Sequence, residues 1–196
     1  MSIVVDARLN AYRNGGIPQY TRQLINAMSA EAPTTGFTVL QHRRQPERLI
    51  TATNVTRRVI YTPPHHRCES WVLPIEIGVI RPQVALFPDF VAPTRRSFPA
   101  VVTIHDLAFL HFDDLLDDYA KAFYAQVGPS AKRADGIIAV SESTKRDIVE
   151  LLDIPPERIT VIYEAAAARF TPLPTIPHER KRINDIDVIA NEYLLF

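Results

Sequence analysis

The sequence is poor in cysteine, in glycine and in long apolar runs, and each scarcity excludes a class of protein. Cys68 is the only cysteine among 196 residues, so the chain can form no internal disulfide and no metal site built from cysteines. Lysine plus arginine and aspartate plus glutamate number 22 each, and this balance gives no support for a nucleic-acid partner. No apolar run is long enough to cross a bilayer, and the first residues do not resemble a signal peptide. We therefore expect a cytoplasmic protein.

Short β-branched runs alternate with longer segments of helical periodicity along the chain. The strand-like runs are residues 3–5, 36–42, 58–61, 84–87, 100–104, 136–140 and 158–163. Helices are expected over residues 17–28, 69–80, 115–134 and 141–152. The second of these is apolar nearly all round, which predicts a buried helix. The alternation predicts an α/β fold with a Rossmann-like, doubly wound, mostly parallel sheet of about six to seven strands.

A pair of glycines separates the first strand from the first helix. Gly15 and Gly16 close the polar loop after Asp6, and Pro18 suits the first helical position. Glycine lets backbone N–H groups approach a ligand closely, and a helix N-terminus carries about half a positive elementary charge. The pattern indicates an anion site, although neither the dinucleotide fingerprint nor the Walker sequence is present. The alternative is a loop in which glycine only permits a turn.

The fifth strand-like run ends abruptly in His105-Asp106. In an open parallel sheet the carboxyl ends of the strands line the ligand crevice, so His105 is expected at the rim of a site. Asp106 either orients the imidazole or caps the next helix, and an ordinary loop histidine is the alternative for His105. Another histidine pair, His65-His66, has no second ligand pair at metal-binding spacing and is interpreted as surface loop.

The helix after the sixth strand has an unusual first turn. Ser141 is a good N-cap, but Lys145 and Arg146 follow where positive charge opposes the helix dipole. The two basic side chains therefore suit an anionic ligand or a carboxylate partner, unless they point to solvent. Much later, from Thr171 on, the chain becomes rich in proline and then in basic residues, which is typical of an exposed linker.

Four sequence blocks occur in an order that is typical of one enzyme family. The blocks are Asp6-Ala-Arg with Gly15-Gly-Ile-Pro-Gln-Tyr-Thr-Arg, then Thr103-Ile-His-Asp-Leu, then residues 134–148, then residues 154–161. In order and spacing they closely resemble the N-terminal domain of retaining, GT-B-fold glycosyltransferases of the group 1, or GT4, class. One departure is Glu164-Ala165-Ala166, which stands where family members commonly have an Asn-Gly turn.

The resemblance implies a division of the chain and an activity. Residues 1–170 would be the acceptor-side, Rossmann-like domain, and residues 171–196 the interdomain linker with the first strand of a missing C-terminal, donor-binding domain. The activity would be retaining transfer of a hexosyl unit from a nucleotide sugar to a hydroxyl of a glycan or lipid-linked acceptor, as in polysaccharide biosynthesis. No cofactor and no metal are expected, and the isolated domain would lack turnover because positioning needs both walls of the cleft.

Carried over residue by residue, the resemblance also assigns roles. Gly15 and Gly16 would approach the donor diphosphate, and His105 would be the catalytic residue beside the donor sugar. The acceptor-side candidates that face the cleft are Asp106, Ser141 and Lys145.

Three questions stay open at this point. A nucleotide-sugar epimerase of the GT-B fold is one alternative function, and a stand-alone, non-enzymatic α/β binding domain is another. A weak peripheral contact with the inner face of the membrane is also open, because many such transferases act on lipid-linked acceptors. The sequence shows no long basic amphipathic helix that would indicate such a contact.

Overall fold

The computed structural model describes residues 2–66, 68–93, 95–112, 114, 116–167, 170–171, 180–183 and 186–189. The chain divides into two compact units, Met1–Glu164 and Ala165–Phe196. Within the described part of the chain, no helix is both long and apolar enough to span a membrane.

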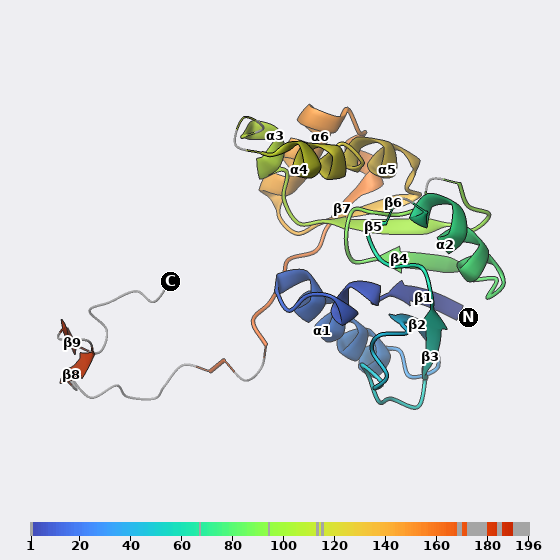
Figure 1. Cartoon of the computed structure of the whole chain (residues 1–196), viewed down its shortest axis with the longest axis horizontal. Coiled ribbons are helices and arrows are strands. Elements are labelled where there is room, and N and C mark those ends of the chain that lie inside the picture. The colour runs from blue at the N-terminus through green and yellow to red at the C-terminus, as the bar shows by residue number, and fades with distance from the viewer. Residues whose placement is uncertain are drawn as a thin grey trace. The chain divides into compact units, whose positions relative to one another are not determined.

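The first unit is built on a seven-stranded parallel sheet with the strand order β3-β2-β1-β4-β5-β6-β7 (Figure 1). Its strands are β1 (Ser2–Asp6), β2 (Gly36–His42), β3 (Val55–Ile60), β4 (Val84–Phe87), β5 (Ala100–Ile104), β6 (Gly136–Ala139) and β7 (Ile159–Val161). The predicted α/β fold is confirmed. The strand order reverses between β1 and β4, and this switch point is where doubly wound sheets bind ligands.

Successive strand residues point to opposite faces of the sheet, so apolar side chains lie on both faces. Helices cover each face. The helices are α1 (Gly16–Glu31), α2 (Glu69–Gly78), α3 (Ala108–His111), α4 (Asp118–Tyr124), α5 (Val127–Arg133) and α6 (Glu142–Leu152), with 3-10 turns η1 (Arg8–Ala11) and η3 (Pro156–Arg158). Val5 belongs to a core cluster with Ile25 of α1, whereas its neighbour Val4 belongs to a second cluster with residues of α2, α5 and α6. The sheet is therefore covered on both faces, as a doubly wound fold requires.

Several predicted helix boundaries are wrong. The segment predicted as one helix over residues 115–134 contains two helices, α4 and α5, with Ala125-Gln126 between them. The one-turn helix α3 lies within residues 107–112, where no helix was predicted. Helix α1 begins at Gly16, so Pro18 is its third residue, where an N–H would still have no helical partner.

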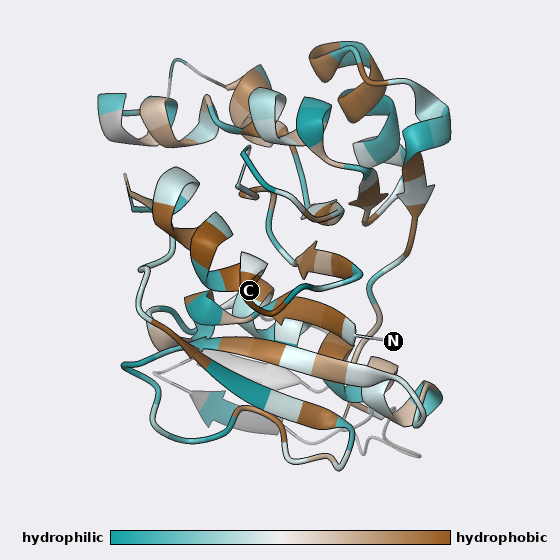
Figure 2. Cartoon of the chain, turned by 90° about the vertical axis from the view of Figure 1, so that its right-hand side faces the viewer, coloured by the Kyte–Doolittle hydropathy of each residue, from teal (hydrophilic) through white to brown (hydrophobic). Residues whose placement is uncertain are grey.

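The prediction that residues 69–80 form a buried helix is half right. In α2, Leu73 and Ile77 are fully buried, but Trp71 and Ile75 are 61% and 69% exposed, and Val79 directly after the helix is 66% exposed. Figure 2 looks onto the side of the molecule on which α2 lies and shows its ribbon mostly in brown. The sequence could not show this exposure, because apolar residues on both sides of a helix give no periodic signal for the inner face.

The second unit contains an antiparallel pair of strands, β8 (Arg180–Ile183) and β9 (Ile186–Ile189). The sequence predicted only a linker over these residues. The strand expected from residues 191–196 lies outside the described residues.

Candidate functional site

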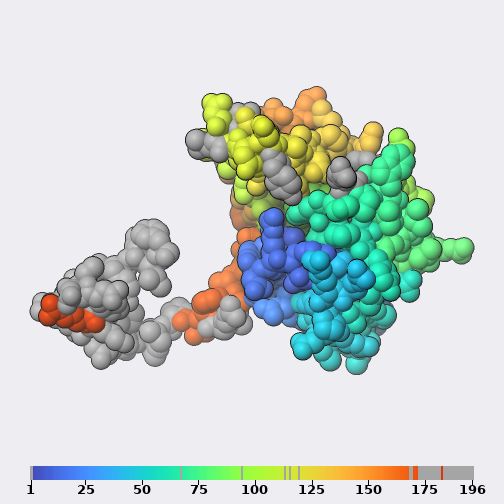
Figure 3. Space-filling model, viewed as in Figure 1, coloured from blue at the N-terminus to red at the C-terminus, as the bar shows by residue number. Residues whose placement is uncertain are grey.

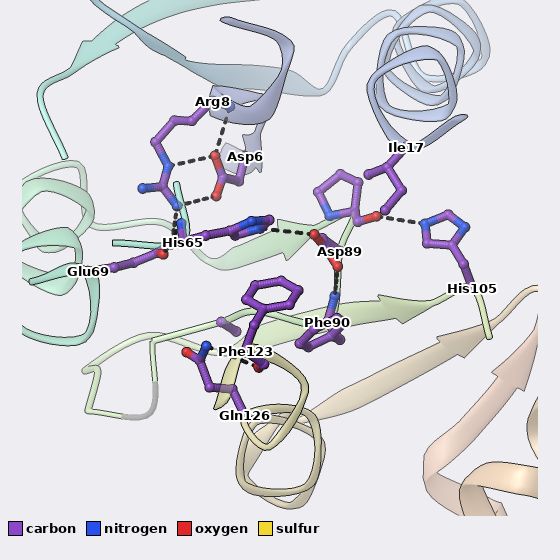
Figure 4. A network of polar contacts seen from close by, with 12 residues as sticks. Asp6, Arg8, Ile17, His65, Glu69, Asp89, Phe90, His105, Phe123 and Gln126 are labelled. Carbon is purple, nitrogen blue, oxygen red and sulfur yellow. Dashed lines mark hydrogen bonds and ion pairs between the residues drawn. The ribbon is translucent and has the colours of Figure 1, made fainter. Parts of the chain in front are cut away.

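The parallel strands bring five polar residues to one side of the sheet, each at the carboxyl end of a strand or within three residues of it. Asp6 ends β1, Asp89 follows β4, His105 follows β5, Ser141 follows β6 and Glu164 follows β7. Residues far apart in the sequence therefore meet at the edge where open α/β sheets hold ligands. Figure 4 shows the polar contacts of several of these residues.

A buried arginine occupies the switch point between β1 and β4. The Arg8 side chain is 1% exposed and donates through Nε and Nη2 to the two carboxylate oxygens of Asp6, at 2.9 and 2.7 Å. Its Nη2 also donates to Oε1 of Glu69, and its Nη1 donates to the carbonyl of Thr62 at 3.1 Å. Arg8 thereby ties the end of β1 to the loop after β3 and to the first turn of α2.

The charges of this cluster are tightly coupled. Burial alone lowers the pKa of Arg8, but the carboxylates of Asp6 and Glu69 outweigh burial and hold that pKa above its ordinary value. Burial raises the pKa of Glu69, and the charge of Arg8 offsets only part of that rise. One permanent cation is thus shared by the buried carboxylate of Glu69 and the partly buried carboxylate of Asp6.

Glu69 fixes a histidine that the sequence had placed on a surface loop. Its Oε2 accepts the backbone N–H of His65 at 2.7 Å, and His65 has a left-handed backbone with φ of 58°. The ring of His65 pairs through Nε2 with Oδ2 of Asp89 at 3.1 Å and lies 4.6 Å from the ring of Phe123. His65 is only 14% exposed in its side chain, so the surface-loop prediction is wrong for it, whereas His66 is exposed.

Two hollows of the surface adjoin this edge. A cavity of about 610 Å³ lies beside the start of α2 and along α4 and α5, lined by small apolar side chains together with His65, Phe123 and Gln126. A cavity of about 190 Å³ lies beside Gly15 and is lined by Arg13 and Arg22, among other residues. The first has the size and the mixed lining of a small-molecule site.

His105 is held on both ring nitrogens. Nε2 lies 2.9 Å from the carbonyl oxygen of Pro88, and Nδ1 lies 3.0 Å from Oε1 of Glu164. These two contacts fix the ring of His105 between the loop after β4 and the loop after β7. The ring also meets the ring of Tyr20 edge to face, with centroids 4.9 Å apart.

The glycine pair begins α1, one helical turn before Tyr20. Gly15 is the N-cap with extended backbone, Gly16 is the first helical residue, and no atom lies within 4 Å of the place where a Cβ would be at either residue. The conformation at these positions does not require glycine; the missing side chains instead leave open space at the helix N-terminus. Through Tyr20 the start of α1 is a neighbour of His105, and Figure 3 shows this blue segment on the same side as the yellow-green one after β5.

Two further residues that were predicted for the site, Asp106 and Ser141, form hydrogen bonds with backbone N–H groups. Asp106 Oδ1 accepts the N–H of Ala108 at 3.0 Å, so Asp106 caps the next turn and Glu164, not Asp106, pairs with the imidazole. Ser141 Oγ accepts the N–H of Thr144 at 3.0 Å and caps α6.

The first turn of α6 also contacts the strands beneath it. Thr144 Oγ1 donates to the carbonyl of His105 at 3.2 Å, which ties α6 to the end of β5. Lys145 donates through Nζ to the carbonyl of Ile159, in the edge strand β7, at 2.9 Å. The sequence had placed Lys145 at the cleft, and its part in ligand binding stays a prediction.

Five residues of the site were not predicted from the sequence, namely Arg8, Glu69, Asp89, Tyr20 and Glu164. Two of them carry a signal that was available, since Asp89 and Glu164 follow strand-like runs in the same way as His105. The rule that strand ends line the crevice, applied to every strand, would have included both. The role of Arg8 depends on a contact with Glu69, 61 residues away, which no local pattern shows.

No group of three or more histidine, cysteine, aspartate or glutamate side chains among the described residues is placed to hold a metal ion.

No curated protein matches the sequence. Residues 14–166 match the family model described as Glycosyltransferase Family 4, a stretch that contains the glycine pair, His105, Ser141 and Glu164. With most of its length in that match and the seven-stranded parallel sheet that the resemblance implied, the chain belongs to Glycosyltransferase Family 4.

Proposed function

We propose that this chain forms one wall of the active site of a cytoplasmic, retaining glycosyltransferase. The reaction is transfer of a hexosyl unit from a nucleotide sugar to a hydroxyl of a glycan or a lipid-linked acceptor, with no metal and no further cofactor. Membership in Glycosyltransferase Family 4 supports glycosyl transfer. The observation that carries the assignment of the site is that the start of α1 and His105 adjoin at one edge of the sheet.

The donor diphosphate binds at the N-terminus of α1. The N–H groups of Gly16 and Ile17 lie in the first turn and have no acceptor inside the helix, and the helix dipole favours an anion there. Arg13 and Arg22 in the adjoining cavity add positive charge. The open space beside the glycines allows phosphate oxygens to come within hydrogen-bond distance of the backbone.

His105 binds the donor sugar through Nδ1. The contact of Nε2 with the carbonyl of Pro88, itself a buried residue, fixes the plane of the ring. The contact of Nδ1 with Glu164 involves a carboxylate that is half exposed, so a sugar hydroxyl can replace it. The ring then orients the reacting carbon, while Tyr20 supports it from one side.

The acceptor binds in the 610 Å³ cavity, where the ring of Phe123 offers an apolar surface and Gln126 and the His65–Asp89 pair offer hydrogen bonds. Such a mixture suits a sugar ring, which is polar at its edge and apolar on its faces. Asp106, Ser141 and Lys145 act in this proposal by holding the loops around His105.

The test is a thermal-shift screen of the 196-residue chain with uridine, guanosine and adenosine diphosphate sugars. A bound donor raises the midpoint of unfolding by mass action. The Gly16→Val variant should keep the unliganded midpoint, because nothing surrounds that position, and should lose the response to ligand. The matched control is Gly78→Val, an equally open glycine at the end of α2. A response to ligand that is as large in Gly16→Val as in the unchanged chain would contradict the proposal.

A further inference from the structure

Two arginines and two tyrosines gather at the carboxyl ends of β1, β2 and β3. Arg43 and Arg44 directly follow β2. Tyr61 directly follows β3, and Tyr12 ends the 3-10 turn η1 that follows β1. We name these four residues the basic rim. The rim lies on the same side of the sheet as the candidate site, because the carboxyl ends of parallel strands share one edge. Figure 3 shows the blue and the cyan parts of the chain side by side.

Each arginine of the rim lies over one of the tyrosine rings. The guanidinium carbon of Arg44 is 5.0 Å from the centroid of the Tyr12 ring, and that of Arg43 is 5.8 Å from the centroid of the Tyr61 ring. The hydroxyl of Tyr12 lies 3.1 Å from Nε2 of the buried His42, which fixes the tyrosine beside β2. Both arginines are exposed, so their N–H groups remain open to a ligand.

The rim carries an excess of positive charge. Neither Arg43 nor Arg44 forms an ion pair with any residue that the structure describes. Residues 1–61 contain eight arginines against three acids, although the formal net charge of the whole chain is zero. Burial lowers the pKa of His42, and the charges of Arg44 and Arg43 lower it further, as expected beside cations without an acid partner. The positive charge at this edge is therefore a local feature that suits an anionic ligand.

The tyrosines supply the only large apolar groups of this surface. Tyr61 is 66% exposed and Tyr12 is 36% exposed, and no other large apolar side chain among residues 2–66 is exposed. A phospholipid layer would therefore meet no aliphatic side chain that could enter it. A flat aromatic ring with a polar tip instead suits a partner that combines apolar faces with hydroxyl groups, as a sugar ring does.

We propose that the basic rim binds an acidic glycan, which is the acceptor of the reaction. Arg43 and Arg44 pair with the carboxylates of its acidic sugars through their forks of N–H groups. Tyr12 and Tyr61 pack against its sugar rings. The glycan runs on into the acceptor cavity, where His65 belongs to the wall, four residues after Tyr61. The inference rests on the proposed function, because membership in a glycosyltransferase family is what favours a glycan over another polyanion.

The experiment compares an oligogalacturonate with its methyl ester, which contains the same sugars without the negative charges. Both are titrated calorimetrically into the 196-residue chain in about 0.05 M salt, where exposed charges are weakly screened. The acid should bind at least about tenfold more tightly than the ester, since two exposed ion pairs form only with the acid. Salt at about 0.5 M should remove most of that difference.

Variants separate the contribution of charge from that of ring packing. Arg43→Gln with Arg44→Gln should lower the affinity for the acid to that for the ester. Tyr61→Ser should weaken the binding of both ligands by the same factor, because ring packing does not depend on charge. The matched control is Arg95→Gln with Arg133→Gln, which removes two exposed arginines outside the rim and should leave both affinities unchanged. Circular dichroism checks that each variant is folded.

Three results would overturn the proposal. The first is no binding of the acid, and the second is equal affinity for the acid and the ester. The third is tighter binding of an oligothymidylate, or of vesicles that contain phosphatidylglycerol, through Arg43 and Arg44, which would assign the rim to a nucleic acid or to a lipid surface. The thermal shift with nucleotide sugars reports on the start of α1, so failure of this proposal is distinguishable from failure of the proposed function.

Discussion

At the scale of single residues, we expect the loss of the Arg8 guanidinium to lower the free energy of unfolding. Replacing it by glutamine leaves Asp6 and Glu69 facing each other without a cation, and breaking a buried pair in this way costs about 3–5 kcal/mol of unfolding free energy. Urea unfolding of Arg8→Gln measures the loss. Arg13→Gln, at an exposed arginine five residues along, should change the free energy by less than about 0.5 kcal/mol. A loss below about 1 kcal/mol in Arg8→Gln would show that the cluster is not the anchor described.

The imidazole of His105 should add to the affinity for the sugar of the donor and not to the affinity for its nucleoside diphosphate. The unchanged chain is expected to bind a nucleotide sugar more tightly than the bare nucleoside diphosphate, because Nδ1 contacts the sugar. In His105→Ala the difference between the two affinities should disappear, while the affinity for the diphosphate at α1 stays. Calorimetric titration with both ligands measures this, and a preference that survives the substitution would remove His105 from the sugar site.

The lowered pKa of His42 should make the stability of the fold depend on pH. Burial lowers the pKa of His42 below its ordinary value, and the positive charges of Arg44, Arg43 and Arg8 lower it further, against the contact with the carbonyl of Tyr61. The unfolded chain therefore binds a proton at a higher pH than the folded chain does. Its contribution to stability is fully present above about pH 6.5 and is lost as the pH falls below that value.

Urea midpoints at about pH 7.5 and 5.5 measure this dependence. His42→Gln should flatten the fall between the two values, whereas His66→Gln, at an exposed histidine, should leave it as it is. A His42→Gln chain that loses as much stability as the unchanged chain would contradict the prediction.

At the scale of elements, α6 depends on its cap. Ser141 Oγ accepts the N–H of Thr144, and loss of a serine N-cap costs about 1 kcal/mol. Ser141→Ala should therefore lower the free energy of unfolding by about that amount in urea titrations. Ser143→Ala, two residues on and exposed in the same helix, should have almost no effect. Equal effects of the two substitutions would mean that the hydroxyl of Ser141 does not cap the helix.

The strands could be predicted from the sequence more reliably than the helices, for a physical reason. A strand buried on both faces is a short β-branched run, and the runs at β2 and β4 gave their bounds directly. The break between α4 and α5 has no clear signal in the sequence, since Gly128 and Pro129, the residues that most often interrupt a helix, are both helical. The exposure of Ile75 likewise has no signal in the sequence, because α2 carries apolar residues on both its buried and its exposed side.

At the scale of the whole molecule, the site is a product of topology. Gly16, His105, Ser141 and Glu164 adjoin one edge only because all the strands between them run in parallel. The sequence predicted His105 and the glycines from their places after strands and before a helix. It could not predict the His65–Asp89 pair, because that pair joins loops after β3 and β4 and needs the left-handed turn that Glu69 holds.

We propose that the start of α1 and His105 together bind a nucleotide sugar. A titration of the ¹⁵N-labelled chain with such a donor, followed by amide chemical shifts, tests this binding site residue by residue. We expect the largest changes at Gly15, Gly16, Ile17 and His105. Changes confined to the amino ends of the strands, at Gln83 and Gly136, or no changes at all, would contradict the proposed binding site.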